Sequence, residues 1–376
     1  MITPGNEADL AEAVAGARGP LRLRGGGTRA LGNPVTGEIL SVAGLSGVTL
    51  YEPGALTLVA QAGTPLAEIE TMLAGQSQRL AFEPMDHRGL MGTTGEPTIG
   101  GVVAANVSGP RRIAVGACRD HLLGVRFVDG QGTVLKNGGR VMKNVTGYDL
   151  VKLMAGSYGT LGFLSEVSLK VLPKSDVTGV VLIEGLSDTD AVRALSMALG
   201  SPFEVTGAAH APVGIDGAPV TMIRIEGFEA SVAYRAGELQ KLLAQFGDSV
   251  VESDPAKTRA RWACVRDVGP FQGQAGDVWR ISVKPGDGPA LGAALQAEGL
   301  LYDWGGGLIW ALVSEGTDLR ARMGGVPGHA TLVRASDATR GELAAFHPEA
   351  APLAAISAGL RAKFDPRGIL NPGLMG

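Results

Sequence analysis

The chain has 376 residues, 45% of them hydrophobic and 19% charged, so it is long enough for two or three domains with substantial cores. Its formal net charge of −4 gives no excess of basic residues of the kind that binds nucleic acid or anionic lipid. Without a long uncharged apolar run or a basic N-terminus ahead of an apolar stretch, the sequence predicts neither a membrane-spanning helix nor a secretory signal.

The N-terminal part of the chain predicts a helix followed by a strand and a glycine-rich loop. Residues 6–17 form the helix, with Asn6 as its N-cap, and Leu21–Arg24 form the strand. The loop that follows is Arg24-Gly25-Gly26-Gly27-Thr28, and Arg29 comes next. Adjacent glycines let successive backbone N–H groups turn toward one point, which makes an anion site suited to the pyrophosphate of a dinucleotide. A flexible surface turn is the alternative interpretation.

The same loop fits the G-x-G-x-x-A pattern of nicotinamide-binding doubly wound folds, through Gly25, Gly27 and Ala30. That fold needs a long helix to begin at the loop, so that the N-terminus of the helix faces the phosphates. Residues 31–37 contain two glycines and a proline, which exclude such a helix. We therefore expect backbone amides and the Thr28 hydroxyl to hold the phosphates without a helix behind them.

A second glycine cluster covers residues 92–109, after predicted strands near 39–42 and at 56–62 and a helix at 63–73. Its small residues would let a flat, rigid ligand lie against the main chain, as a flavin ring does. Polar groups for the ring edges come from Thr94, Thr98, Asn106 and Ser108. A tightly packed helix with small-residue contacts is the alternative.

A third glycine cluster, residues 156–167, leads directly into a predicted strand at 163–172. Before it come a predicted hairpin, with strands at 122–129 and 133–135, and a short helix at 150–155. The loop from Lys143 to Asp149, which includes Tyr148, suggests a function that the residues alone do not specify. Pro173 marks the expected edge of the first domain.

From Lys174 the pattern becomes that of a second α+β domain. Two similar units of alternating strands and helices follow one another and suggest a weak internal repeat. The predicted strands are 179–184, 205–209, 220–227, 278–283 and 308–313, and the predicted helices are 188–199, 230–246, 255–265 and 289–298. After a link at 341–347, an amphipathic helix at 348–364 precedes the tail, 365–373.

The glycine clusters and the tail together resemble the vanillyl-alcohol oxidase type family of FAD-binding oxidases and dehydrogenases. The resemblance rests on R-G-G-G-T at 24–28, T-I-G-G-x-x-A-x-N-x-x-G at 98–109, G-S-x-G-T-L-G-x-x-x-E-V at 156–167 and D-P-x-G-I-L-N-P-G at 365–373. In that family these segments hold the pyrophosphate, line the flavin, meet the adenine side and return an asparagine to the cofactor. The resemblance thus implies the following FAD-binding residues: Arg24, Gly25, Gly26, Gly27, Thr28, Arg29, Thr94, Thr98, Ile99, Gly100, Gly101, Asn106, Ser108, Gly109, Gly159, Thr160, Gly162, Phe163 and Asn371.

Further strings resemble the smaller flavin subunits of bacterial glycolate oxidases. They include A-N-V-S-G-P-R-R at 105–112, V-W-R-I-S-V at 278–283 and L-Y-D-W-G-G-G at 301–307. Such subunits work beside a larger flavin subunit and an iron–sulfur subunit. The resemblance implies a two-subdomain FAD domain at 1–173, an α+β cap domain at 174–345 and a C-terminal segment, 346–376, that packs back on the FAD domain. Members with covalent flavin carry a histidine where this chain has Thr28, so noncovalent FAD is expected.

Oxidation of a 2-hydroxy acid needs a hydride acceptor, a base for the hydroxyl proton and a cation for the carboxylate. We expect Arg280, Trp304 and His329 of the cap to lie over the flavin ring. The larger subunit's relatives use an H-x-G-D-G-N-x-H stretch with a metal, which this chain lacks, so no metal is expected. The two cysteines form no C-x-x-C, and the five histidines are scattered. Arg111 and Arg112 offer charge for a phosphate or a partner.

The sequence therefore predicts a cytoplasmic FAD subunit of a glycolate oxidase-type complex, associated with a membrane only through its partners. Its flavin either oxidises a small 2-hydroxy acid or relays electrons to the iron–sulfur partner, and the missing histidine stretch favours the relay. A self-sufficient FAD dehydrogenase of another small alcohol or acid is one alternative. A scaffold subunit whose flavin only stabilises the fold is another.

Overall fold

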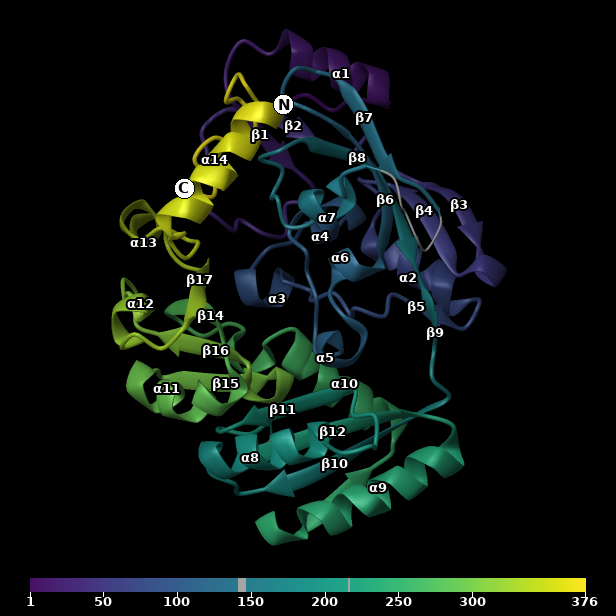
Figure 1. Ribbon diagram of the computed structural model, residues 1–376, viewed down its shortest axis with the longest axis vertical. Helices are drawn as coiled ribbons and strands as arrows, with labels where there is room; N and C mark the ends of the chain where they lie inside the picture. Colours follow the sequence, from purple (N-terminus) through teal and green to yellow (C-terminus); the bar gives the residue numbers. More distant parts are fainter. Residues whose placement is uncertain (141–146, 216) are drawn as a thin grey trace.

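The computed structural model describes residues 1–140, 147–215 and 217–376 (Figure 1). Helices and strands are mixed throughout, which confirms the predicted α+β class. Within these residues the strands form one eight-stranded and one five-stranded antiparallel sheet and two sheets of two strands each. The eight-stranded sheet occupies the lower part of the molecule in Figure 1, and the other sheets lie above it.

A small parallel sheet brings both ends of the chain together. Its strands are β1 (Leu21–Arg24) and β2 (Glu38–Ser41), and bridges add Ile2 beside Leu40 and Leu370 beside Leu21. Helix α1 (Glu7–Gly16) precedes β1 and begins as predicted, because the side chain of Asn6 accepts the N–H of Asp9 at 2.9 Å. No helix begins between Gly25 and Gly37, as predicted from the glycines and proline there.

The five-stranded sheet has the order β3-β4-β8-β6-β7. The sequence predicted each of these strands except β3, and it missed several short helices. The strands are β3 (Val48–Glu52), β4 (Thr57–Gln61), β6 (Leu122–Val128), β7 (Val134–Gly138) and β8 (Phe163–Lys170), and β5 (Gln78–Arg79) pairs separately with β9 (Leu172–Pro173). The helices are α2 (Leu66–Ala74), α3 (Arg88–Met91), α4 (Ile99–Ala104), α5 (Arg112–Val115), α6 (Cys118–His121) and α7 (Leu150–Met154).

The eight-stranded sheet is built from two β-α-β-β-α-β units. The first contains β10 (Val177–Glu184), α8 (Asp188–Leu199), β11 (Gly207–Ala211), β12 (Val220–Gly227), α9 (Glu229–Leu243) and β13 (Ser249–Glu252). The second contains β14 (Asp277–Val283), α11 (Gly288–Leu295), β15 (Gly299–Asp303), β16 (Leu308–Val313), α12 (Leu319–Arg322) and β17 (Gly328–Arg334). The sheet order β13-β10-β12-β11-β15-β16-β14-β17 places the second unit as a reversed copy of the first. This topology agrees with the suggested internal repeat.

The two units meet where His210 of β11 pairs with Tyr302 of β15. Between them the chain forms α10 (Pro255–Arg266), which the sequence predicted. The remaining elements are α13 (Asp337–Glu342), α14 (Ala351–Phe364) and five short 3₁₀ segments, η1 (Pro53–Ala55), η2 (Ala244–Phe246), η3 (Gly269–Phe271), η4 (Pro285–Asp287) and η5 (Trp304–Gly306).

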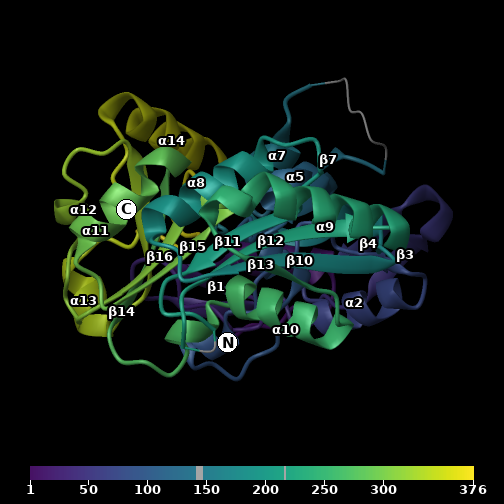
Figure 2. The ribbon, with the colours of Figure 1, turned by 90° about the horizontal axis from the view of Figure 1, so that it is seen from below.

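Both faces of the eight-stranded sheet are buried. Along β10, Val181 and Ile183 pack into a core beneath α8 and α9, whereas Val180 and Leu182 belong to the main core shared with the five-stranded sheet. Figure 2 shows α8 and α9 lying across one side of the strands. Because one core continues from the first sheet system into the second, the two parts of the molecule are packed firmly against each other.

The C-terminal part returns to the N-terminal elements. Helix α14 lies near β1 and β2 in Figure 1, and Leu360 and Phe364 pack against the main core although no residue of the helix is fully buried. The domain boundaries at 173 and 345 stay a prediction. Lys143 of the predicted 143–149 loop lies outside the described residues, and Tyr148, which lies within them, is exposed.

Candidate functional site

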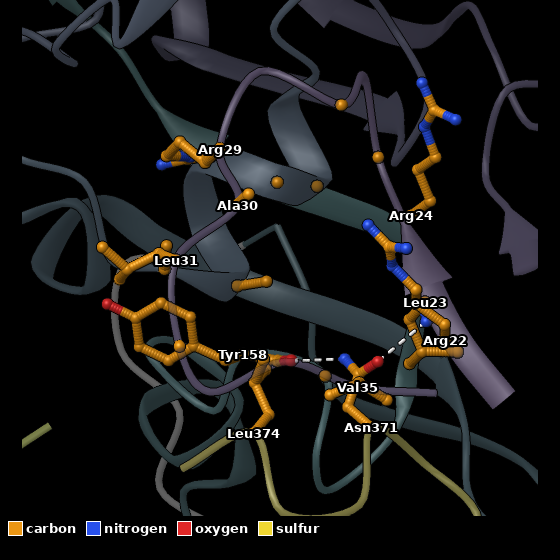
Figure 3. A pocket seen from close by; sticks show the side chains of 18 of the residues that line it. Arg22, Leu23, Arg24, Arg29, Ala30, Leu31, Val35, Tyr158, Asn371 and Leu374 are labelled. Carbon is orange, nitrogen blue, oxygen red and sulfur yellow. Dashed lines mark hydrogen bonds between the residues drawn. The ribbon is translucent and has the colours of Figure 1, made fainter. Parts of the chain in front are cut away.

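A pocket of about 540 Å³ lies between β1, the glycine loop that follows it, α4 and the C-terminal tail (Figure 3). Thirteen of the residues predicted to bind FAD line it. They are Arg24, Gly25, Gly26, Gly27, Thr28, Arg29, Thr98, Gly100, Gly101, Gly159, Gly162, Phe163 and Asn371. The tertiary structure thus brings all the predicted cofactor segments together around one cavity.

The glycine loop is pressed against residues 95–98, which explains its composition. A Cβ atom on Gly26 would lie 1.5 Å from the carbonyl oxygen of Glu96, and one on Gly25 would lie 2.8 Å from Thr98 Oγ1. Gly27 has a φ of +73°, in the left-handed region that favours glycine. The loop therefore cannot carry side chains at these positions without moving away from the pocket wall.

Helix α4 continues the wall against which the loop is pressed. Thr98 caps it by accepting the N–H of Gly101 at 3.3 Å, and Gly100 allows close packing because its Cβ would lie 2.6 Å from Ala62 Cβ. The sequence placed no helix behind the phosphate loop, but the short helix α4 borders the same pocket. Of the two interpretations of residues 92–109, the tightly packed helix is therefore correct for residues 99–104. The same helix also lines the pocket.

Asn371 joins the tail to both sides of the pocket. Its Oδ1 accepts the N–H of Leu23 at 2.8 Å, and its Nδ2 donates to the carbonyl oxygen of Tyr158 at 2.9 Å (Figure 3). Asn371 has a φ of +45°, which asparagine tolerates better than most residues. One side chain thus connects β1, the third glycine cluster and the tail.

Replacement of Asn371 by alanine should lower the free energy of unfolding by about 1–3 kcal/mol, because it leaves a partly buried donor and a partly buried acceptor without partners. FAD should also bind more weakly, because the pocket walls are no longer joined. Asn371→Asp keeps the acceptor for Leu23 but places an oxygen where Nδ2 donates to the Tyr158 carbonyl, so it should also be destabilised. Chemical denaturation and flavin titration measure both effects, and equal stability of Asn371→Ala and the wild type would contradict this role.

Arginines supply the charge of the pocket. Arg22 and Arg24 extend from β1 on one side, and Arg29 lies across from them (Figure 3). Among the described residues, no carboxylate forms a salt bridge with any of these three guanidinium groups. Arg29 Nη1 is buried and has no hydrogen-bond partner. Unpaired guanidinium groups beside a glycine loop fit a ligand that carries phosphates.

A second group of arginines surrounds Trp304, at the junction with the eight-stranded sheet. The Cζ atoms of Arg112 and Arg280 lie 4.6 and 5.1 Å from the centre of the Trp304 ring, within the range of cation–π contacts. Trp304 Nε1 donates to the carbonyl oxygen of Gly109 at 3.2 Å and fixes the ring. Burial lowers the pKa of Arg280 to about 10, so the guanidinium still carries its charge at neutral pH.

The predicted residues Arg280, Trp304 and His329 lie outside the lining of the pocket. Tyr158, which lines the pocket, is near enough to both Arg29 and Arg280 for their charges to lower its pKa against the larger raising effect of burial. His329 is exposed at the start of β17. Burial of part of its ring lowers its pKa, and the charge of Arg280 lowers it further. The expected catalytic role of Arg280, Trp304 and His329 stays a prediction.

Six predicted cofactor residues do not line the pocket. Thr94 is exposed and Ile99 lies in the core, while the other four bond to neighbouring segments through side chain or backbone: Asn106 to Arg119, Ser108 to Cys118, Gly109 to Phe82 and Trp304, and Thr160 to Ser157. Their role in FAD binding stays a prediction.

Several lining residues were not predicted. Arg22 could have been found, because in the strand Leu21-Arg22-Leu23-Arg24 it shares a face with Arg24. Asp337 and Arg340 of α13 line the pocket from a distant part of the chain, and Arg340 bonds to the carbonyl oxygen of Ala30. No local pattern marks these two positions.

Arg111 and Arg112, adjacent in sequence, have different environments. Arg111 Nη2 lies 2.8 Å from Glu226 Oε1 and Arg111 Nη1 lies 3.0 Å from Glu83 Oε1, so two carboxylates already compensate the charge of Arg111. The suggestion that it binds a phosphate or a partner stays a prediction. Arg112 faces Trp304 and forms no salt bridge within the described residues. In the same residues, no three His, Cys, Asp or Glu side chains are grouped to hold a metal ion.

Comparison with known proteins agrees with this geometry. A family described as "FAD binding domain" matches residues 1–138. The protein named glycolate oxidase subunit GlcE, from Escherichia coli strain K12, is 37% identical over 361 residues, which cover 95% of this chain and 92% of the relative. The chain belongs to the GlcE family of glycolate oxidase subunits.

Other relatives match only part of their length. Glycolate oxidase subunit GlcD of Bacillus subtilis strain 168 is 31% identical over 168 residues, 44% of this GlcE-family chain and 34% of the relative. A solved structure of alkyldihydroxyacetonephosphate synthase superposes with a TM-score of 0.71 at 17% identity and covers 99% of this chain and 76% of that one. The latter likeness concerns the fold alone.

These findings confirm three predictions. The fold is of the vanillyl-alcohol oxidase type, the cofactor is FAD, and the protein is an FAD-dependent oxidoreductase of the glycolate oxidase type. GlcE proteins are named as subunits, which indicates a multi-subunit complex. No helix in the described ranges combines the length and apolarity needed to cross a bilayer.

Proposed function

We propose that this GlcE-family chain binds FAD noncovalently in the pocket of Figure 3 and oxidises a small 2-hydroxy acid beside Arg280. The observation that carries the proposal is the continuity of the site. One side of the pocket has the glycine loop with Arg22 and Arg24, and the other side has Arg29 and Tyr158, where the charge of Arg280 also reaches Tyr158. When bound, FAD supplies the hydride acceptor for the oxidation.

The residues of the chain would divide the remaining tasks. Arg280 binds the substrate carboxylate, because its guanidinium stays charged and forms no salt bridge within the described residues. Trp304 holds Arg280 and Arg112 in place through its two cation–π contacts and its hydrogen bond to Gly109. His329, which is near enough to Arg280 for its charge to act on the imidazole, offers a polar edge to the substrate.

This assignment favours direct oxidation over a pure electron relay. The sequence favoured the relay because the histidine-rich metal stretch of the larger subunit is missing. Oxidation is supported because the charged Arg280 forms no salt bridge within the described residues, and burying such a charge is costly unless an anion accompanies it. The carboxyl of Asp303 interacts with Arg280 without forming a salt bridge, and burial raises the pKa of Asp303 to about 7, so it compensates the charge only in part at neutral pH. The electrons would then pass to the proposed larger flavin subunit and iron–sulfur subunit of the same complex. A cytoplasmic location, with membrane association through these partners, stays part of the proposal.

Anaerobic mixing of the FAD-loaded protein with glycolate or D-lactate tests the function. We expect bleaching of the flavin absorbance, and we expect Arg280→Met to slow it at subsaturating substrate by about 10²-fold, the effect of losing a charge-assisted contact of about 2–3 kcal/mol. Arg119→Met, at an exposed arginine, serves as the matched control and should behave as the wild type. A yellow protein that neither acid can bleach would contradict direct oxidation.

The mode of FAD attachment is tested separately. Thr28 lines the pocket at the position where covalent flavoproteins of the family carry a histidine. We therefore expect acid precipitation to release all the flavin into the supernatant. Flavin that remains with the precipitated protein would contradict noncovalent binding.

A further inference from the structure

The charge of Arg29 has no partner among the described residues. Arg29 lines the pocket, and no described residue accepts a hydrogen bond from its guanidinium or forms a salt bridge with it. Its Nη1 atom is buried, so water does not replace the missing partner at that atom. Asp337, a carboxylate of the pocket lining, is exposed on α13 and forms no salt bridge with Arg29. Because arginine keeps its proton in proteins, the pocket contains an uncompensated positive charge.

The other arginines of the lining are stabilised in different ways. Arg22 and Arg24 are exposed, so water solvates their charges. Arg340 donates to the carbonyl oxygen of Ala30. Burial lowers the pKa of Arg29, which reflects the cost of holding its charge away from water. Arg29 is therefore the lining arginine that gains most from an anionic group placed in the pocket.

Arg24 and Arg29 lie against different glycine segments. A Cβ atom on Gly27 would lie 2.7 Å from Arg24 Nη2, so this guanidinium follows the glycine loop. A Cβ atom on Gly101 would lie 3.3 Å from Arg29 Nη2, so that guanidinium lies beside the first turn of α4. Figure 3 shows the two arginines on opposite sides of the pocket. Arg24 thus accompanies the proposed phosphate site, and Arg29 adjoins a different part of the pocket.

The surface beside Arg29 suits a flat ring. Gly100 and Gly101 have no side chains, Ala104 and Ala105 have only methyl groups, and all four residues line the pocket. Small residues let an aromatic ring approach the main chain closely. This is the segment proposed above to line the flavin, so the guanidinium of Arg29 lies against the proposed flavin surface.

Reduction changes the charge of a flavin. A hydride carries two electrons and one proton, so its transfer to the neutral oxidised ring adds one negative charge. A cation that is already fixed beside the ring stabilises this charge without reorganisation, and its effect is larger where water is excluded. The buried guanidinium is costly without an anion, and the reduced ring supplies that anion.

We propose that Arg29 stabilises the negative charge that the flavin ring gains on reduction and so makes the bound FAD a stronger oxidant. The role rests on the proposed binding of FAD in this pocket, and it does not depend on which molecule donates the hydride. The donor loses two electrons, the flavin gains them, and Arg29 neither gains nor loses a proton.

The midpoint potential of the bound flavin in Arg29→Met tests the proposal, by anaerobic equilibration with a reference dye. We expect reduced FAD to bind about 10–10²-fold more weakly relative to oxidised FAD than in the wild type, the effect of losing one charge-assisted contact. This lowers the two-electron potential by about 30–60 mV, since a tenfold change corresponds to about 30 mV. Arg29→Lys keeps the charge and should recover most of the shift. Arg119→Met, at an exposed arginine outside the pocket, should leave the potential unchanged.

Arg24→Met distinguishes this role from phosphate binding. The phosphates carry the same charge in both oxidation states, so Arg24→Met should weaken the binding of oxidised and reduced FAD alike and leave the potential unchanged. In Arg29→Met, the binding of oxidised FAD should change less than about threefold, because the proposed contact is made with the reduced ring. Weak binding of oxidised FAD by Arg29→Met, or a wild-type potential in this variant, would overturn the proposal.

Sulfite gives a second measurement that needs no turnover. Its sulfur lone pair forms a bond to N5 of the oxidised flavin, and the displaced electron pair leaves a negative charge on the ring. The dissociation constant for sulfite, followed by the loss of flavin absorbance, should therefore rise about 10–10²-fold in Arg29→Met and recover in Arg29→Lys. Equal dissociation constants in Arg29→Met and the wild type would overturn the proposal.

The outcomes separate this role from the proposed oxidation. A wild-type flavin that glycolate and D-lactate cannot reduce, but whose potential and sulfite affinity both fall in Arg29→Met, contradicts direct oxidation and supports the role of Arg29. A flavin that glycolate reduces, with the same potential in Arg29→Met as in the wild type, overturns the role of Arg29 alone. A wild-type protein that binds no FAD overturns both.

Discussion

Replacement of Gly26 by alanine is expected to abolish FAD binding at micromolar cofactor. The new Cβ would lie 1.5 Å from the carbonyl oxygen of Glu96, which belongs to the backbone and cannot rotate away. The loop must therefore move, and its backbone N–H groups then no longer point toward the proposed position of the pyrophosphate. Loss of two such hydrogen bonds, at about 1.5–3 kcal/mol each, weakens binding by about 10²–10⁴-fold.

Titration of the apoprotein with FAD, followed by the quenching of flavin fluorescence and by the shift in melting temperature, measures this effect. Gly19→Ala is the matched control, because a Cβ at Gly19 meets no atom within 4 Å and the position has no positive φ. The control should bind FAD as the wild type does. Wild-type affinity in Gly26→Ala would contradict the assignment of the glycine loop to the pyrophosphate.

Replacement of Glu226 by alanine is expected to cost about 3–5 kcal/mol of stability, the usual effect of breaking a buried ion pair from one side. Glu226 has a side chain that is 3% exposed, and it contacts Arg79 at 2.7 Å and Arg111 at 2.8 Å. Arg224, which is adjacent, pairs with Glu83 at 3.0 Å. Because Arg79, Glu83 and Arg111 precede residue 173 whereas Arg224 and Glu226 follow it, the network joins the two proposed domains.

Chemical denaturation of Glu226→Ala and of Glu238→Ala compares the loss of a carboxylate from a buried ion pair with the loss of one from an exposed ion pair. Glu238 forms an exposed pair with Lys241 at 2.7 Å on the surface of α9, and its loss should cost less than about 1 kcal/mol. Similar losses in the free energy of unfolding for the two variants would contradict the proposal that the buried network stabilises the protein more than an exposed ion pair does. Because the network lies at the junction that carries Arg280, the Glu226 variant should also reduce its flavin more slowly.

The same network sets a dependence of stability on pH. Burial opposes the ionisation of Glu226, but hydrogen bonds from Arg111 and the charges of Arg224, Arg111 and Arg79 outweigh it and hold the pKa of Glu226 well below its usual range. In Glu83, Arg224 and Arg111 likewise overcome the effect of burial and lower the pKa. A carboxylate with a lowered folded-state pKa stabilises the protein above its unfolded pKa of 4.5 and loses that contribution as pH falls toward the folded value. Between about pH 4.5 and pH 2, the free energy of unfolding should therefore fall less steeply with decreasing pH in Glu226→Gln than in the wild type.

Local pattern was sufficient to predict most of the fold and the cofactor. The strands that the sequence predicted correctly either have apolar residues on both faces or alternate regularly between apolar and polar residues. The start of the first helix is recognisable because Asn6 is a favourable N-cap residue. The glycine loop that lines the pocket was recognised because Gly26 lies so close to Glu96 that glycine is required there, and such a requirement is visible in the sequence. Its role in binding phosphate stays a prediction. The strand β3 was missed because none of its residues is fully buried, so its pattern is weak.

The arginine group around Trp304 could not be predicted, because it depends on contacts between segments that are distant in the sequence. Arg112 and Arg280 come from opposite parts of the chain and meet only because Trp304 lies between them. Arg111 could not be distinguished from Arg112 by sequence, because the difference is made by Glu83 and Glu226.

By itself the sequence therefore determined the class of fold, the cofactor and the glycine-rich segments that line the pocket with Asn371, because each depends on local backbone conformation or on a motif of adjacent residues. Only the tertiary structure decided which charges are paired and which arginines are left for an anion. The physical reason is that pairing and desolvation are set by neighbours across the core, whose identity no short stretch of sequence contains.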